Sequence, residues 1–277
     1  MRVDAHQHFW RISRGDYDWL TPQDHPAICR DFGPDDLALL LIGAGIERTV
    51  LVQAAQTDAE TRYLLDLAEL TGFVAGVVGW TDLEAPDAPE KIEALARHPK
   101  LKGLRPMLQG LEDDGWIVRP ALAPALKAVR AAGLRLDALV MPRHLPYLAA
   151  FLAAHPDLPV VIDHGAKPDI AAGGNDAWAT AMLQIGEETG AYCKLSGLVT
   201  EAAPGWTEET LKPYVGVLLQ AFGPRRLMWG SDWPVVNEAG GFAAWRAAAD
   251  ALTEACSPED RDWIFGRTAQ RFYGIEP

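Results

Sequence analysis

Two histidines separated by one residue, His6 and His8, lie near the start of the chain. If this stretch is a β-strand, side chains two residues apart point to the same face, so the two imidazoles converge on one point. Neutral imidazoles are good ligands for zinc and similar divalent ions. The pattern predicts one half of a metal site, although a His-x-His pair also occurs in strands that bind nothing.

Two later motifs carry further ligand groups. In DHGAKP, residues 163–168, His164 can supply a third nitrogen ligand and Lys167 a cation. In GSDWP, residues 230–234, the small residues allow a sharp turn that leaves Asp232 projecting. Each motif has a structural alternative: a hydrogen-bonded Asp–His pair in a strand, and an aspartate that caps the next helix.

Three imidazole nitrogens and one carboxylate leave room for water, as catalytic metal sites do. We expect one divalent metal, zinc as the first choice, bound by His6, His8, His164 and Asp232. A bound metal lowers the pKa of water towards about 7 and polarises a carbonyl. Asp232 would then take the proton of the water as general base, with His164 also at the catalytic centre. The predicted chemistry is metal-assisted hydrolysis.

Polar and aromatic side chains near the other expected strand ends are candidates for substrate contact. Arg105, Lys167 and Lys194 together would suit an oxyanion or a negative group of the substrate. Asp137 and Lys194 could instead pair with each other inside the fold. The candidate substrate-binding residues are Arg105, Lys167, Gln53, Trp80, Asp137, Lys194, Trp10 and Trp233.

The elements that must position these groups alternate along the chain. Stretches with helical periodicity, including residues 60–71, 89–98, 120–132 and 142–154, separate β-rich runs. The eight expected strands are residues 3–8, 49–53, 73–80, 101–107, 134–141, 160–164, 192–198 and 227–229. Alternation of this kind implies parallel strands with right-handed crossovers. We therefore predict an α/β fold, a (β/α)₈ TIM barrel formed by residues 1–277 as a single domain. An open doubly wound sheet is the alternative, but the glycine-rich turn of dinucleotide-binding folds is absent after the first strand.

Composition narrows the function classes. Of 277 residues, 25 are Lys or Arg and 38 are Asp or Glu, which gives a net charge of −13 and disfavours nucleic acid as a partner. Three widely separated cysteines exclude a disulfide framework. Because no apolar run is long enough for a membrane span, we expect a cytoplasmic protein with no membrane partner. A homo-oligomer is compatible with the sequence. We expect the long segment 9–33, rich in aromatic residues, to form a lid or a pocket wall.

Several short motifs together resemble a known family. They are HQHFW at 6–10, YDWL at 17–20, KGLR at 102–105, DHGAKP, KLSG at 194–197, GSDWP and TAQRFYG at 268–274. The pattern is similar to that of the amidohydrolase superfamily. More narrowly, it resembles the branch of TIM-barrel metal-dependent hydrolases that contains the sugar lactonases, such as L-fuconolactonase and L-rhamnonolactonase. The match is collinear over nearly the whole chain.

This resemblance implies a distorted barrel of the amidohydrolase type, with the metal and catalytic centre at His6, His8, His164 and Asp232. It also implies hydrolysis of a sugar lactone to the sugar acid. Pro106 follows Arg105 where many relatives have a histidine, and Gly165-Ala166 departs from the usual order of small residues before the lysine. Some members of the superfamily hydrolyse lactones without a metal, so metal-independent catalysis stays an alternative.

Three other functions remain open at this point. The first is a hydrolase of an anionic lactone of the muconolactone type, which a cationic pocket mouth would favour. The second is a metal-dependent non-oxidative decarboxylase built on the same scaffold. The third is a barrel that binds a ligand without turning it over, against which the complete set of His and Asp ligands argues. In every case the expected partner is a small molecule.

Overall fold

The computed structural model describes residues 1–276, and its centre is a ring of eight parallel strands joined in chain order. The strands are β1 (Val3–Gln7), β2 (Arg48–Val52), β3 (Val74–Gly79), β4 (Leu101–Leu104), β5 (Arg135–Ala138), β6 (Val160–Ile162), β7 (Tyr192–Leu195) and β8 (Leu227–Trp229). All neighbouring pairs from β1 to β8 are parallel. The predicted (β/α)₈ barrel is confirmed, and most expected strands are shorter than predicted because their last residues turn into loops.

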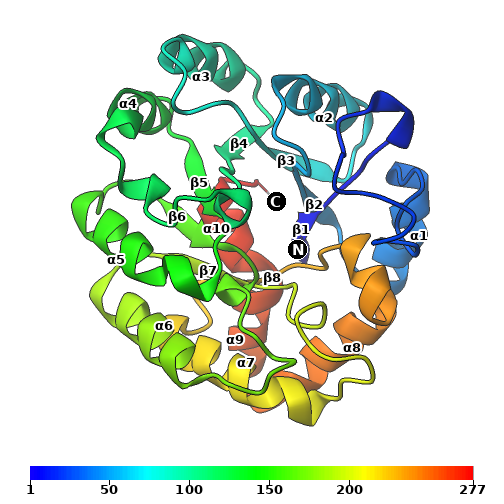
Figure 1. The fold of residues 1–277 in the computed structure, drawn as a ribbon. Coiled ribbons are helices and arrows are strands. Elements are labelled where there is room, and N and C mark those ends of the chain that lie inside the picture. The colour runs from blue at the N-terminus through cyan, green and yellow to red at the C-terminus, as the bar shows by residue number, and fades with distance from the viewer. Residues whose placement is uncertain (277) are drawn as a thin grey trace.

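Helices surround the strand ring, as Figure 1 shows. They are α1 (Pro34–Ala44), α2 (Asp58–Leu70), α3 (Ala88–Ala96), α4 (Ala123–Ala131), α5 (Leu145–Ala154), α6 (Asp176–Glu188), α7 (Glu208–Phe222), α8 (Gly241–Leu252), α9 (Pro258–Asp262) and α10 (Thr268–Tyr273). Proline in the first turn suits α1, α3, α4 and α5, since that position needs no N–H donor. In residues 1–276 no helix combines the length and the apolar character that a bilayer crossing demands.

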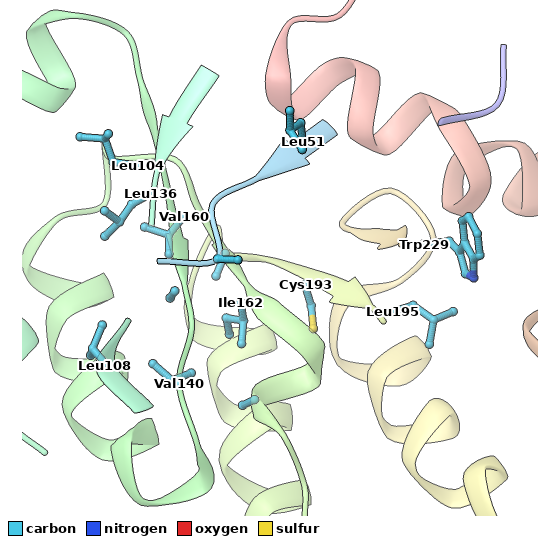
Figure 2. Close-up of a cluster of buried hydrophobic side chains, with 14 of the residues drawn as sticks. Leu51, Leu104, Leu108, Leu136, Val140, Val160, Ile162, Cys193, Leu195 and Trp229 are labelled. Carbon is cyan, nitrogen blue, oxygen red and sulfur yellow. The ribbon is translucent and has the colours of Figure 1, made fainter. Parts of the chain in front are cut away.

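Side chains that leave the strands in opposite directions form two apolar layers. Leu104, Ile162 and Trp229 belong to the outer layer between strands and helices, part of which Figure 2 shows. An inner cluster at the amino ends of the strands contains Val161 and packs against Phe272 of α10. In Figure 1, α10 (red) lies across this end of the barrel, so the carboxyl ends of the strands are left for a site.

The barrel closes between β8 and β1 through the segment that follows β8. The backbone N–H of Asp232 donates to the carbonyl of His6 at 2.8 Å, and the N–H of His8 donates to the carbonyl of Trp233 at 2.7 Å. These two hydrogen bonds place the end of β1 directly beside the turn after β8. The hydrogen bonds that close the barrel therefore also bring Asp232 beside His6 and His8.

A register irregularity in β1 turns both histidines inward. Val3 and Ala5 belong to the inner apolar cluster, so strict alternation would direct His6 away from the interior. The pairing of β1 with β2 shifts register between Asp4 and Gln7. A bulge of this kind re-aims the side chains that follow it. It explains why His6 and His8 both reach the site.

Candidate metal and active site

The four predicted ligands meet at the carboxyl ends of β1, β6 and β8. The Nε2 atoms of His6 and His8 lie 3.2 Å apart. The Oδ1 atom of Asp232 lies 3.3 Å from Nε2 of His8, 3.6 Å from Nε2 of His6 and 3.9 Å from Nε2 of His164. Each of the four residues is at most 4% exposed. Residues separated by more than 220 positions thus form one compact cluster.

Unusual backbone conformations concentrate at this cluster. Within residues 1–276, the non-glycine residues with positive φ are His164, Ala166, Lys167 and Asp232, at 53°, 61°, 50° and 56°. Left-handed backbone costs on the order of 1–3 kcal/mol for such residues and persists where the surrounding structure enforces it. Here it directs His164 and Asp232 towards each other from the ends of β6 and β8, which flank β7.

The hydrogen bonds of His8 and His164 leave their Nε2 atoms directed into the cluster, as a divalent cation requires. Nδ1 of His8 lies 2.8 Å from the carbonyl oxygen of Val52. Because a carbonyl only accepts, this nitrogen carries the proton, and the lone pair of His8 Nε2 faces the cluster. Nδ1 of His164 contacts Oγ of Ser196 at 2.9 Å, which leaves its Nε2 directed at Asp232. Imidazole nitrogens with one carboxylate are the ligand types that zinc takes in catalytic sites.

The charge states of Asp232, His164 and His6 at neutral pH also suit the binding of a metal ion. Burial tends to raise the pKa of Asp232, but the imidazoles of His164, His6 and His8 outweigh it and hold that pKa below its usual value. Burial lowers the pKa of His164 to about 4, and burial together with Lys194 lowers the pKa of His6. A carboxylate among neutral imidazoles is the state that binds a metal ion.

A layer of buried charge lies directly beneath His6. The ammonium of Lys194 contacts Oδ2 of Asp137 at 2.6 Å, Oδ1 of Asp163 at 2.9 Å and Nδ1 of His6 at 3.0 Å. The hydroxyl of Tyr273, on α10, donates to Oδ2 of Asp137 at 2.6 Å. Although burial opposes it, Lys194 above all holds the pKa of Asp163 well below its usual value. Asp137 and Lys194, predicted to bind substrate, have no exposed surface and instead support His6 from below.

A pocket of about 530 Å³ opens above the cluster. Its walls come from loops at the carboxyl end of the barrel, including the segment 9–33, which a pair of backbone hydrogen bonds between Trp10 and Phe32 fixes in place. Of the predicted substrate-binding residues, Arg105, Lys167 and Trp10 line this pocket. Its lining also contains His8, His164, Asp232, Trp19, His25, Glu201 and Glu238.

Both permanent cations that line this pocket are paired with carboxylates. Nη1 of Arg105 lies 3.2 Å from Oδ2 of Asp163. Nζ of Lys167 lies 2.7 Å from Oε1 of Glu201. Gln53, a predicted substrate-binding residue, is fully buried: its Nε2 donates to the carbonyl of Arg105 at 2.9 Å, and its Oε1 accepts from that guanidinium at 3.3 Å. The pocket therefore offers polar groups with little free positive charge.

Comparisons with known proteins agree with this fold and site. The model of the amidohydrolase family matches residues 3–275. The chain belongs to this family.

Relatives of this amidohydrolase match along their whole length. It is 50% identical over 279 residues to an L-fucono-1,5-lactonase of Burkholderia ambifaria, covering 99% of this chain and 96% of that protein. It is 35% identical to an L-fucono-1,5-lactonase of Burkholderia multivorans, with 99% and 96% covered. A solved amidohydrolase of Burkholderia multivorans with bound zinc has a TM-score of 0.94 at 34% identity, with 100% of each chain covered.

Two predicted aromatic contacts lie away from the main pocket of this amidohydrolase. Trp233 is 2% exposed and packs edge-on against Phe9 and Phe32, at ring distances of 6.0 and 5.2 Å. Trp80 lines a neighbouring hollow of about 220 Å³. That hollow shares Met107 with the main pocket, so it lies beside the site.

Sequence reasoning missed several residues that the fold brings to the site. Glu201 and Glu238 reach the pocket from the loops after β7 and β8, and Tyr273 reaches Asp137 from the C-terminal helix. His25 lies 2.9 Å from Glu238, across two loops that are 213 positions apart. Glu201, Glu238 and His25 lie outside the motifs named above. Tyr273 lies in the motif TAQRFYG, to which the sequence assigns no chemistry. No sequence signal therefore marked their roles.

Proposed function

We propose that this amidohydrolase is a lactonase that hydrolyses a neutral sugar lactone, such as L-fuconolactone or L-rhamnonolactone, to the free sugar acid. The observation that carries the proposal is the pocket itself. It opens onto a buried carboxylate among three imidazoles, and its two cations, Arg105 and Lys167, are already paired. The two L-fucono-1,5-lactonases among the relatives support the same substrate class.

In this proposal His6, His8, His164 and Asp232 hold one divalent ion, and zinc is the ion proposed. Two overlapping triads, His6–His8–Asp232 and His6–Asp163–His164, bring donor atoms close enough to hold an ion, and the zinc-bound relative supports the choice. When bound, the ion supplies a Lewis acid that polarises a carbonyl oxygen and makes water more acidic.

Asp232 is the proposed general base. Its carboxylate is ionised at neutral pH and takes one proton from water as the water oxygen attacks the lactone carbonyl carbon. The carbon–oxygen bond of the ring then breaks, and the same proton passes to the departing ring oxygen, which becomes a hydroxyl group. The products are a carboxylic acid and an alcohol on one chain, which balances the addition of one water molecule.

The remaining predicted residues take supporting roles in this scheme. Arg105, at the pocket wall, can donate to the oxygen that becomes negative during attack. Gln53 holds Arg105, while Lys194 and Asp137 hold His6 from below. Trp10 stacks at 6.3 Å on His8 and is fully buried, and Trp19 lies edge-on to it, so the exposed indole of Trp19, backed by Trp10, forms an apolar wall suited to the ring face of a sugar. Trp233 packs against Phe9 and Phe32, and Trp80 lines the neighbouring hollow.

An anionic lactone or a carboxylate substrate of a decarboxylase would place a negative group at the pocket wall, where it would require a free cation besides the proposed metal ion. A buried or half-buried negative group without a cationic partner is strongly disfavoured. Arg105 and Lys167 each have a carboxylate partner within 3.2 Å, so neither offers a free positive charge to an anion. The pocket therefore favours a neutral substrate over the two alternatives.

The test is acid release from a panel of lactones in weakly buffered indicator solution. The panel holds L-fucono-, L-rhamnono-, L-galactono- and D-arabinonolactone together with one anionic muconolactone, and each is measured before chelation, after chelation and after zinc is restored. We expect fast, stereoselective hydrolysis of neutral members, loss on chelation and recovery with zinc. Hydrolysis of the muconolactone alone, or of no member, would contradict the proposal. Activity that survives chelation would contradict its metal dependence only.

A further inference from the structure

Of the two cations that line the pocket, Lys167 is the more exposed. Arg105 is 3% exposed, and Asp163 and Gln53 hold its guanidinium from behind. The side chains of Lys167 and its partner Glu201 are each 22% exposed. An anionic group that enters the pocket would therefore compete with Glu201 for Lys167.

The chain holds Lys167 firmly in this place. It ends a run of left-handed residues that begins at His164, and its N–H donates to the carbonyl of His164 at 2.9 Å. The indole of Trp178 donates to the carbonyl of Gly165 at 2.7 Å and fixes the middle of the run. The direction of the Lys167 side chain is thus coupled to that of His164, beside the reaction centre.

Glu201 is anchored just as firmly on the opposite side. Its carbonyl accepts from the N–H of Ala171 at 3.0 Å, and its own N–H donates to the carbonyl of Leu198 at 3.3 Å. Its carboxylate meets the ammonium of Lys167 at 2.7 Å, within the lining of the pocket. A second carboxylate in the lining of the pocket, that of Glu238, pairs with His25 instead.

We propose that Glu201 is a specificity-determining residue: it neutralises Lys167 and so excludes lactones that carry a carboxylate or sulfonate group. The inference rests on the proposed lactonase function and names the residue that sets the charge of its substrates. Specificity of this kind comes from an unfavourable interaction with the wrong ligand, since an anion would meet Glu201 unless that residue gave up Lys167. Removing the carboxylate frees a cation in the lining of the pocket that contains His164 and Asp232.

A purely structural ion pair makes a different prediction. If Glu201 and Lys167 only tie two loops together, losing the pair would lower activity on every substrate to a similar extent. A specificity role changes the ratio of activities between matched substrates. L-galactono-1,4-lactone and the enantiomer of galactaro-1,4-lactone with the same ring differ only by a carboxylate in place of the terminal alcohol, so they form a suitable pair.

The experiment compares kcat/KM for these two lactones in the wild type, Glu201→Gln, Glu201→Ala and the double variant Lys167→Met/Glu201→Gln, with Glu238→Gln as the matched control. In both single Glu201 variants we expect the ratio of anionic to neutral kcat/KM to rise about tenfold or more. In the double variant the ratio falls back towards the wild-type value, because the freed cation is gone. Glu238→Gln leaves Lys167 paired, so its ratio stays within about threefold of the wild type.

Two results would overturn the proposal. One is a ratio in the Glu201 variants that stays within about threefold of the wild type. The other is a raised ratio that persists in the double variant, which would show that Lys167 plays no part. If the wild type hydrolyses neither of these two lactones, the wider lactone panel described above tests the lactonase proposal separately. Equilibrium binding of the galactarolactone then tests the charge role: tighter binding to Glu201→Gln than to the wild type supports it, and equal binding overturns it.

Discussion

Two lysines paired with carboxylates lie at different depths in the same barrel. Lys194 is fully buried below His6 and contacts Asp137 and Asp163 as well as the imidazole. Lys167 lies at the pocket wall above the site, with the single carboxylate of Glu201 as its partner. The chemical groups are the same, but their access to water and their number of partners differ.

Because of this difference, we expect one pair to support the fold and the other to take part in substrate recognition. A buried charge is tolerated only where good geometry and several partners replace its hydration, and removing one partner leaves the others uncompensated. A partly exposed pair contributes little to stability, because water and salt already screen it. The lower pair is therefore expected to govern folding, and the upper pair to govern which substrates bind.

The largest expected effect is the loss of stability in Lys194→Met. The substitution keeps the apolar stem but leaves Asp137 and Asp163 as buried carboxylates without their shared cation. Breaking a buried pair in this way costs about 3–5 kcal/mol. Denaturant unfolding of Lys194→Met and wild type measures the change. Equal stability of the two proteins would show that the buried layer does not support the fold.

The matched substitution at the upper lysine should change stability far less. We expect Lys167→Met to alter the free energy of unfolding by less than about 1 kcal/mol, as is typical of a partly exposed ion pair. The same denaturant titration measures it. A loss as large as that of Lys194→Met would erase the distinction between the two depths.

Tyr273→Phe should give an intermediate effect. The hydroxyl of Tyr273 donates to Asp137 at 2.6 Å, inside the buried layer, and the ring remains in the variant to fill the same space. Loss of a hydrogen bond to a charged group costs about 1.5–3 kcal/mol. Thermal or denaturant unfolding tests this value. No measurable change would mean that Lys194 alone satisfies Asp137.

Glu60 differs from the carboxylates that contact Lys194, because it is a buried carboxylate held by backbone N–H groups. It accepts hydrogen bonds from the N–H groups of Ala54 and Ala55, and burial raises its pKa from 4.5 to about 7. Between these two pH values the folded state therefore binds more protons at Glu60 than the unfolded state does, so this group's contribution to stability falls as pH rises.

Glu60→Gln removes that dependence. We expect the stability of Glu60→Gln relative to the wild type to increase from pH 4.5 to about pH 7, and to level off above it. Parallel unfolding curves at several pH values give the difference, in which the other titrating groups cancel. A difference that stays constant with pH would show that Glu60 has an ordinary pKa.

Much of this arrangement could be predicted from the sequence, because the chemistry lies in local motifs at strand ends. Alternating strands and helices predict the barrel, and parallel strand ends predict that His6, His164 and Asp232 meet. The bulge that turns His6 inward depends on pairing with β2, which local patterns do not encode.

Sequence patterns alone do not determine how deeply the polar side chains near strand ends are buried. They predict Lys167 at the pocket mouth and Lys194 either there or paired with Asp137 inside the fold, and the structure shows the internal pair. Their surroundings differ because of the tertiary structure. Lys194 lies in the barrel interior beside Asp163, whereas Lys167 ends the left-handed run from His164 and contacts the distant Glu201. Partners such as Tyr273 come from distant segments, so only tertiary structure identifies them.

The central claim is that Asp232 performs the chemistry in a site that the buried layer supports. The most direct test measures kcat for a neutral sugar lactone and the free energy of unfolding together in Asp232→Asn. We predict that kcat falls by about 10²–10⁴, as expected when a general base is lost, while the protein stays folded. A kcat within about tenfold of the wild type would contradict the assignment of Asp232 as the base.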